Sequence, residues 1–128
     1  MNKIGHITLL VDDVDKVFDF YVSKLNFKKV DDLTMPNGYR WLTVAPQSQQ
    51  EIALVFVVAD SSDKIQRIGS QTAGHVFMTL QTDDIHRDYA TFKNKGVTFY
   101  GEPYEMPWGT EVVFEDCYGN RFDLVQVK

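Results

Sequence analysis

The chain has 128 residues, of which 44% are hydrophobic and 24% are charged, a composition typical of one folded domain. Its formal net charge is −5 at pH 7 and it contains no basic run, which excludes a nucleic-acid or anionic-membrane surface as its main partner. No stretch approaches the roughly 18 apolar residues that span a bilayer, so we expect a cytoplasmic protein without membrane contact. The single cysteine, Cys117, excludes an internal disulfide.

The first half of the chain predicts the order strand, helix and three strands. Residues 3–11 alternate as in a half-buried strand, with His6 on the face away from the core. Apolar residues then recur at helical spacing over 14–25, after Asp12 or Asp13 as the N-cap. Three further strands are predicted at about 27–33, 39–45 and 51–58, the first two joined by the hairpin signal Asn37-Gly38.

The same order restarts in the second half after a polar segment. Gly74-His75 opens a predicted strand over 74–82, as Gly5-His6 opens the first strand. A helix capped by Asp83 or Asp84 then ends at Lys95-Gly96, where Gly suits the left-handed position after a helix. The remaining strands are predicted around 97–101, 110–115 and 121–127. The pattern indicates one α+β domain, 1–128, made of two modules at about 1–60 and 73–128.

Three polar residues lie at similar places in the predicted strands. His6, His75 and Asp123 each alternate with apolar neighbours, so each is expected on the face away from the helix-packed core. If those faces line one cleft, two imidazoles and one carboxylate could hold a divalent metal such as Fe, Mn, Ni, Co or Zn. Ordinary polar residues at strand starts would give the same pattern, and both interpretations stay open.

The sequence resembles the vicinal oxygen chelate superfamily, which includes glyoxalase I, bleomycin-resistance proteins, fosfomycin-resistance enzymes and extradiol dioxygenases. The resemblance covers nearly the whole chain through several short motifs in the family's order. They are the Gly-His openings of the two halves, Phe18-Asp19-Phe20-Tyr21 followed by Lys24-Leu25-Asn26-Phe27, Lys95-Gly96-Val97, and the ending Phe114-Glu115-Asp116-Cys117-Tyr118-Gly119-Asn120.

The resemblance implies two βαβββ modules whose cupped mixed sheets form a cleft, commonly in a homodimer. In metal-dependent members the ligands come from the first and last strands of the modules. Carried onto this chain, those positions are His6, Ala53, His75 and Asp123. Ala53 has no ligating atom, so the resemblance implies at most a His/His/Asp site, with Asp123 where relatives commonly carry Glu.

Other residues of the expected cleft are candidates for contacts with a substrate. Phe77 shares the face of the second histidine, and aromatic walls could come from Trp41, Trp108 and Tyr104. Arg121 or Arg40 could hold an anionic group of a substrate by a bidentate contact. Glu111, just after the Trp-Gly pair, is the candidate catalytic group for proton transfer.

Two functions follow from this sequence. The first is a divalent-metal-dependent enzyme of the glyoxalase or dioxygenase type, which acts on a small oxygen-rich substrate through His6, His75 and Asp123. The second is a metal-free binding protein that sequesters an aromatic or heterocyclic compound, as bleomycin-resistance proteins do, and in which both histidines only line the pocket. Both functions imply a small-molecule partner and, by resemblance, a homodimer.

Overall fold

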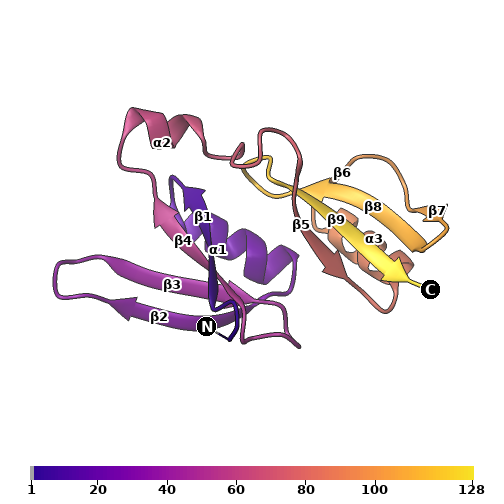
Figure 1. The fold of residues 1–128 in the computed structure, drawn as a ribbon, viewed down its shortest axis with the longest axis horizontal. Helices are drawn as coiled ribbons and strands as arrows, with labels where there is room; N and C mark the ends of the chain where they lie inside the picture. The colour runs from indigo at the N-terminus through magenta and orange to yellow at the C-terminus, as the bar shows by residue number, and fades with distance from the viewer. Residues whose placement is uncertain (1) are drawn as a thin grey trace. The chain divides into compact units, whose positions relative to one another are not determined.

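The computed structural model describes residues 2–128, which form two compact units divided between Ile68 and Gly69 (Figure 1). Each unit contains its own mixed β-sheet with helices beside it, which confirms the predicted α+β class. The boundary between the units lies within the polar segment between the two predicted modules. No helix among residues 2–128 is long and apolar enough to cross a membrane.

The first unit follows the predicted order, with one added helix. Its elements are β1 (His6–Val11), α1 (Val14–Asp19), the π-helical turn η1 (Phe20–Lys24), β2 (Lys28–Thr34), β3 (Arg40–Ala45), β4 (Ala53–Val58) and α2 (Ser62–Gln66). The strands are ordered β1-β4-β3-β2, with β1 parallel to β4 and the other pairs antiparallel. The helix α2 lies in the polar segment where no element was predicted, and Ser61 caps it by accepting from the Lys64 N–H.

The predicted helix over 14–25 begins as expected and changes its winding before it ends. Asp13 is the N-cap, because its side chain accepts hydrogen bonds from the N–H groups of residues 15 and 16. From Phe20 onward the helix widens, and the Leu25 N–H donates to the Phe20 carbonyl at 3.3 Å. Asn26 then adopts a positive φ of 59° and ends the helix.

Strand alternation sets the core of the first unit. Leu9 and Val11 of β1 are fully buried, whereas His6 and Thr8 are exposed on the opposite face. The aromatic ring of Tyr21 fills the space between helix and sheet and is also fully buried. The predicted placement of His6 on the face away from the core is therefore confirmed within this unit.

The second unit repeats the strand and helix order and adds a short strand. Its elements are β5 (Val76–Gln81), α3 (Ile85–Asn94), β6 (Thr98–Phe99), β7 (Tyr104–Met106), β8 (Gly109–Glu115) and β9 (Arg121–Val127). The strand order is β5-β9-β8-β6, with β7 paired to β8 and β5 parallel to β9. The strand expected over 97–101 keeps only two paired residues, and β7 was not predicted.

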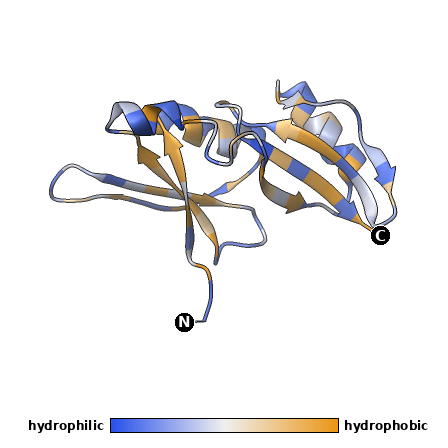
Figure 2. Cartoon of the chain, turned by 45° about the horizontal axis from the view of Figure 1, so that its top comes forward, coloured by the Kyte–Doolittle hydropathy of each residue, from blue (hydrophilic) through white to orange (hydrophobic). Residues whose placement is uncertain are grey.

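One face of this second sheet packs on α3, and the opposite face carries no helix among the described residues of this unit. Phe114 and Phe122 stack at 5.2 Å and are fully buried, and Phe92 of α3 lies 6.2 Å from Phe114. Glu111 and Asp123 alternate with these residues and so occupy the opposite face. Figure 2 shows hydrophilic residues interrupting the hydrophobic strands of this sheet. We call this second surface the open face.

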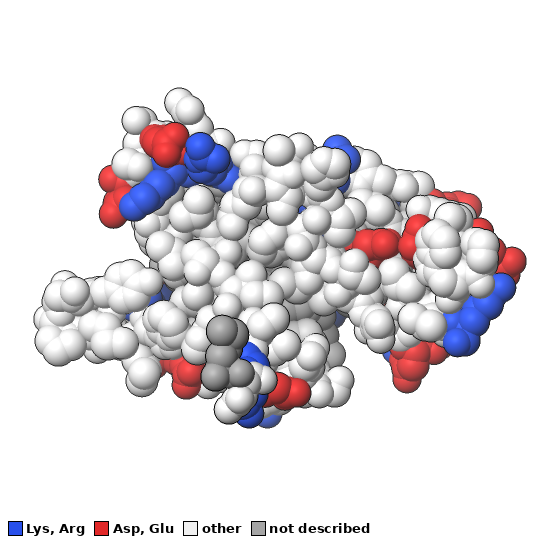
Figure 3. Space-filling model, viewed as in Figure 1, with Lys and Arg blue, Asp and Glu red and all other residues white. Residues whose placement is uncertain are grey.

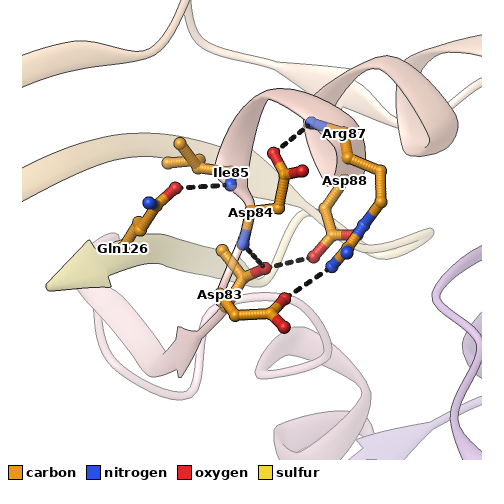
Figure 4. Close-up of polar contacts among 7 residues, drawn as sticks. Asp83, Asp84, Ile85, Arg87, Asp88 and Gln126 are labelled. Carbon is orange, nitrogen blue, oxygen red and sulfur yellow. Dashed lines mark hydrogen bonds and ion pairs between the residues drawn. The ribbon is translucent and has the colours of Figure 1, made fainter.

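The start of α3 is fixed by side chains from three places (Figure 4). Asp84 is the N-cap and accepts from the Arg87 N–H at 3.1 Å. From β9, Gln126 Oε1 accepts from the Ile85 N–H at 2.8 Å. Asp83 forms an exposed ion pair with Arg87. The cap from Gln126 ties the helix to the sheet that carries Asp123.

Candidate functional site

His6 lies in the first unit beside an aromatic ring. Its imidazole meets the indole of Trp41 edge-on, with 5.0 Å between ring centroids. Ala53 is opposite His6 in the β1–β4 pair and is only 3% exposed. The surroundings of His6 are therefore aromatic and apolar, and its pair partner offers no metal ligand.

His75 lies in the turn immediately before β5, not on the strand itself. Its backbone N–H donates to the Thr72 carbonyl at 3.2 Å, and the Thr72 hydroxyl donates to the His75 carbonyl at 2.6 Å. The side chain of His75 is exposed. The turn therefore anchors the backbone of His75 and leaves its imidazole accessible.

A β-bulge follows His75 and breaks the alternation on which the face assignment rested. The register of β5 against β9 shifts between Val76 and Met78, with Phe77 between them. The Phe77 ring contacts the buried ring of Phe122 at 6.0 Å. The prediction that Phe77 shares the face of His75 rested on unbroken alternation, which the extra residue interrupts, so it stays a prediction.

The registers around the predicted ligand positions differ between the two units. Asp123 pairs with Thr79, the fourth residue after His75. In the first unit, the fourth residue after His6 is Leu10, and its partner is Val57. Ala53 is thus opposite the histidine itself, whereas Asp123 is opposite a residue further along β5, beyond the bulge.

Asp123 and Glu111 are diagonal neighbours on the open face of the second unit. In the β8–β9 pair, Asp123 is opposite Val113 and Glu111 is opposite Val125. The Oδ1 atom of Asp123 is buried and has no hydrogen-bond partner among the residues that the structure describes. Burial, the negative charge of Glu111 and a hydrogen bond with Glu111 raise the pKa of Asp123 to about 6.

Glu111 is the centre of a small hydrogen-bond network. The Tyr104 hydroxyl donates to Glu111 Oε1 at 3.1 Å, and the Trp108 indole N–H donates to Glu111 Oε2 at 3.2 Å. The bond to Glu111, with partial burial, raises the pKa of Tyr104. We call Tyr104, Trp108, Glu111 and Asp123 the carboxylate–aromatic cluster. The sequence indicated Trp108 and Glu111, but Tyr104 could be linked to them only through β7.

Gly109 determines where Trp108 sits. A Cβ atom at Gly109 would lie 2.2 Å from the Gln126 carbonyl oxygen of β9, so only glycine fits between the strands. The Trp108 carbonyl accepts from the Lys128 N–H at 3.1 Å, which fixes the backbone on the other side. The close approach of β8 to β9 therefore holds the indole beside Glu111.

Arg121 contacts a different aromatic ring on the same face of the sheet. Its guanidinium lies 4.7 Å from the centroid of the Tyr100 ring, and the Tyr100 hydroxyl donates to Glu115 at 3.0 Å. Arg121 and Glu115 are opposite each other in the β8–β9 pair. Arg40 of the first unit forms ion pairs with Asp15 and Asp32.

The structure therefore brings together some of the predicted residues and separates others by unit. Glu111, Trp108 and Asp123 form one cluster in the second unit, and His6 belongs to the first unit. Within residues 2–128, no three His, Cys, Asp or Glu side chains form a group that could hold a metal ion. A His6/His75/Asp123 site would need ligands from both units.

The chain was compared with known families and structures. A model of the Glyoxalase/Bleomycin resistance protein/Dioxygenase superfamily matches residues 3–124. The chain belongs to this superfamily. The predicted resemblance is thereby confirmed, and superfamily membership accounts for the repeated strand and helix order of the two units.

Within this superfamily, three similar proteins match almost their whole length. An uncharacterized protein of Shewanella frigidimarina (strain NCIMB 400) is 40% identical over 126 residues, which cover 98% of this chain and 93% of that protein. The crystal structure of UcmS2 is 31% identical, covers 98% of both chains and has a TM-score of 0.85. TnmS3, an antibiotic binding protein from Streptomyces sp. CB03234, is 31% identical, covers 100% of this chain and 98% of its own, and has a TM-score of 0.82.

Proposed function

We propose that this superfamily member binds a flat, ring-containing small molecule without a metal ion. The observation that carries the proposal is the carboxylate–aromatic cluster, in which Glu111 holds the polar atoms of Tyr104 and Trp108. TnmS3, described as an antibiotic binding protein, is similar over the whole chain and supports the same class of function.

The rings of the cluster are accessible as well as held in place. Tyr104 is 46% exposed and Trp108 is 52% exposed, although the polar atom of each ring is hydrogen-bonded to Glu111. The hydrogen bonds to Glu111 hold the side chains of Tyr104 and Trp108 in place. A ligand that stacks on these rings therefore loses little binding free energy to the ordering of side chains. Exposed aromatic surface with fixed orientation favours stacking on a planar ring system.

The first unit supports the same interpretation through His6. A histidine that serves as a metal ligand commonly donates its second ring N–H to a carboxylate or carbonyl group. Here the imidazole of His6 lies edge-on against Trp41, and its strand partner is Ala53. We infer that His6 and Trp41 form an apolar wall for a ligand.

The proposal is tested by titrating the full chain with acridine, a neutral three-ring heterocycle at neutral pH, in excess EDTA. Isothermal titration calorimetry should show saturable binding. Trp108→Leu should weaken that binding about tenfold, because it removes the indole surface that the ring contacts. Tyr39→Leu provides the matched control, since Tyr39 is a similarly exposed aromatic residue of the first unit and lies outside the cluster.

Two results would overturn the proposal. One is an absence of saturable acridine binding by a protein whose circular dichroism shows it to be folded. The other is equal loss of affinity in Trp108→Leu and Tyr39→Leu, which would indicate nonspecific adsorption to exposed rings.

A second candidate function is a metal-dependent enzyme with His6, His75 and Asp123 as ligands and Glu111 as the proton-transfer group. The observation that favours it is the buried Oδ1 of Asp123, which a cation could satisfy. Imidazole and carboxylate donors suit Fe, Mn, Ni, Co or Zn, and the ion would supply Lewis-acid chemistry when bound.

Metal analysis separates this candidate from the first. The protein is purified without a chelator or a histidine tag, alongside His75→Ala. A stoichiometric divalent metal in the unmodified protein that is lost in the variant would support the enzyme, and substoichiometric metal in both proteins would remove it.

Further properties belong to both proposals. We propose a cytoplasmic homodimer, on the basis of the superfamily resemblance and the absence of a long apolar segment in the sequence. Phe77 and Arg121 remain predicted ligand contacts. For Arg121 such a contact would require the guanidinium to leave, or share, the ring of Tyr100.

A further inference from the structure

We infer that the carboxylate–aromatic cluster selects planar ligands that carry a cationic nitrogen, which Glu111 and Asp123 would hold while the ring system stacks on Trp108 and Tyr104. This inference rests on the proposed ligand-binding function and names the chemical class of the ligand. It depends on contacts within the second unit alone.

The first step is the charge of the cluster. Glu111 and Asp123 are adjacent on the open face, and their contacts with Tyr104 and Trp108 come from neutral donors. Among residues 2–128, no Lys, Arg or His side chain forms an ion pair with either carboxylate. Figure 3 shows several acidic groups on the visible surface of the second unit. The cluster therefore has two acids and no cation of its own.

The second step is the buried acceptor. Oδ1 of Asp123 has no hydrogen-bond partner in the described part of the chain, although almost every buried polar atom in a protein has one. An acceptor that lacks a donor costs free energy, and a ligand N–H group that reaches it would recover that cost. A hydrogen-bond donor of a ligand would satisfy this atom, and a positively charged donor bonds to a carboxylate more strongly than a neutral one.

The third step concerns the cation nearest along the strand. Arg121 is two residues before Asp123 on β9, but its guanidinium lies over Tyr100, whose hydroxyl is bonded to Glu115. Arg121 also faces Glu115 across the β8–β9 pair. Arg121 therefore interacts with Glu115 and Tyr100. It does not balance the negative charges of Glu111 and Asp123.

The fourth step joins charge with ring surface. A cation close to the faces of Trp108 and Tyr104 is attracted by their π-electrons, and the same cation gains from the two carboxylates. An anionic ligand of equal shape is repelled by both carboxylates. A neutral ring gains from stacking alone, so charge determines the order of affinities among ligands of one shape.

The experiment compares three probes of nearly equal shape on the full chain in excess EDTA at neutral pH. They are 9-aminoacridine, which is a cation, acridine, which is neutral, and anthracene-9-carboxylate, which is an anion. We expect 9-aminoacridine to bind about tenfold more tightly than acridine, and anthracene-9-carboxylate to bind more weakly than both.

Two variants test the roles of Asp123 and Glu111. For each, we compare the affinity for 9-aminoacridine with the affinity for acridine, expressed as a ratio. In Asp123→Asn and in Glu111→Gln this ratio should fall from about ten to about three, because each change removes one of the two negative charges with little change of shape. Glu105→Gln is the matched control and should keep the ratio. Glu105 lies on β7 next to Tyr104 but on the other face of the strand, opposite Thr110.

The outcomes distinguish this inference from the function on which it rests. Equal affinities for acridine and 9-aminoacridine, or a preference for the anion, would overturn the charge selection and leave the ring-binding function standing. Binding of none of the three probes would overturn both. An equal fall of the ratio in Glu105→Gln would show that net charge, and not the cluster, selects the cation. If Glu111→Gln does not fold, Asp123→Asn still decides the question.

Discussion

At the scale of single residues, Asp123 has the clearest link between position and measurable behaviour. Its carboxyl group is half-buried beside Glu111, which raises its pKa from 3.8 to about 6. The folded state therefore holds a proton that the unfolded state has released between those values. The free energy of unfolding should fall as the pH rises from about 4 to about 6, and should show no further dependence on this group above that range.

Asp123→Asn should remove this part of the pH dependence. The shift of about two pKa units corresponds to at most about 3 kcal/mol, and partial exposure reduces the expected gain for the variant at pH 7 to about 1 kcal/mol. Urea unfolding of the unmodified protein and of Asp123→Asn at several pH values measures this difference in the free energy of unfolding. The prediction is wrong if the stability difference between the two proteins is the same at pH 4 and pH 7.

Gly109 is the second residue with a distinct expected cost. Gly109→Ala would place a methyl group against the Gln126 carbonyl oxygen, at 2.2 Å before any adjustment, so β8 and β9 must separate. We expect a loss of about 2–4 kcal/mol in the free energy of unfolding, measured by urea denaturation. Gly5→Ala is the control, because nothing lies within 4 Å of its added Cβ, and it should change stability by less than about 0.5 kcal/mol. Similar values for both would contradict the packing argument.

At the scale of elements, the attachment of α3 to β9 is the feature that the sequence could not show. Gln126 is separated by 41 residues from Ile85, whose N–H it accepts, and the bond exists only because the sheet brings β9 beside the helix start. The sequence predicted the local cap, as Asp83 or Asp84, from residue type alone. Local caps follow from neighbours in the chain, whereas long-range caps follow from the fold.

Gln126→Ala should therefore be more costly than the loss of a surface ion pair at the same helix end. The Ile85 residue is 1% exposed, so its N–H would be left without an acceptor, at a cost of about 1–2 kcal/mol. Asp83→Ala breaks an exposed ion pair with Arg87 and should cost less than about 0.5 kcal/mol. Thermal unfolding of the two variants and the unmodified protein gives the comparison. A larger effect of Asp83→Ala would show that the ion pair, and not Gln126, holds the helix start.

At the scale of the whole molecule, the repeat and the fold class could be predicted because they depend on local periodicity. The strand over 121–127 has the predicted bounds, and the helix and hairpin signals lie where they were expected. The arrangement of the site could not be predicted in the same way. One extra residue at Phe77 shifts the β5–β9 register, and the unpredicted strand β7 brings Tyr104 to Glu111. Both depend on pairing between distant strands.

The proposed site predicts how the stability of the whole molecule responds to metal ions and to ligands. A species that binds only the folded state raises its free energy of unfolding by RT ln(1 + [L]/Kd), so removal of a tightly held metal would lower the unfolding temperature. His6 lies edge-on against Trp41 and its strand partner is Ala53, so we expect the proposed function not to require a metal. Excess EDTA should leave the unfolding temperature unchanged, and 9-aminoacridine should raise it in the presence or absence of EDTA. Differential scanning fluorimetry is unsuited because the probe fluoresces, so circular dichroism is the measurement. The expectation would be contradicted by an unfolding temperature that falls in EDTA, is restored by one divalent metal and does not fall in His75→Ala. That result would favour the His6/His75/Asp123 site.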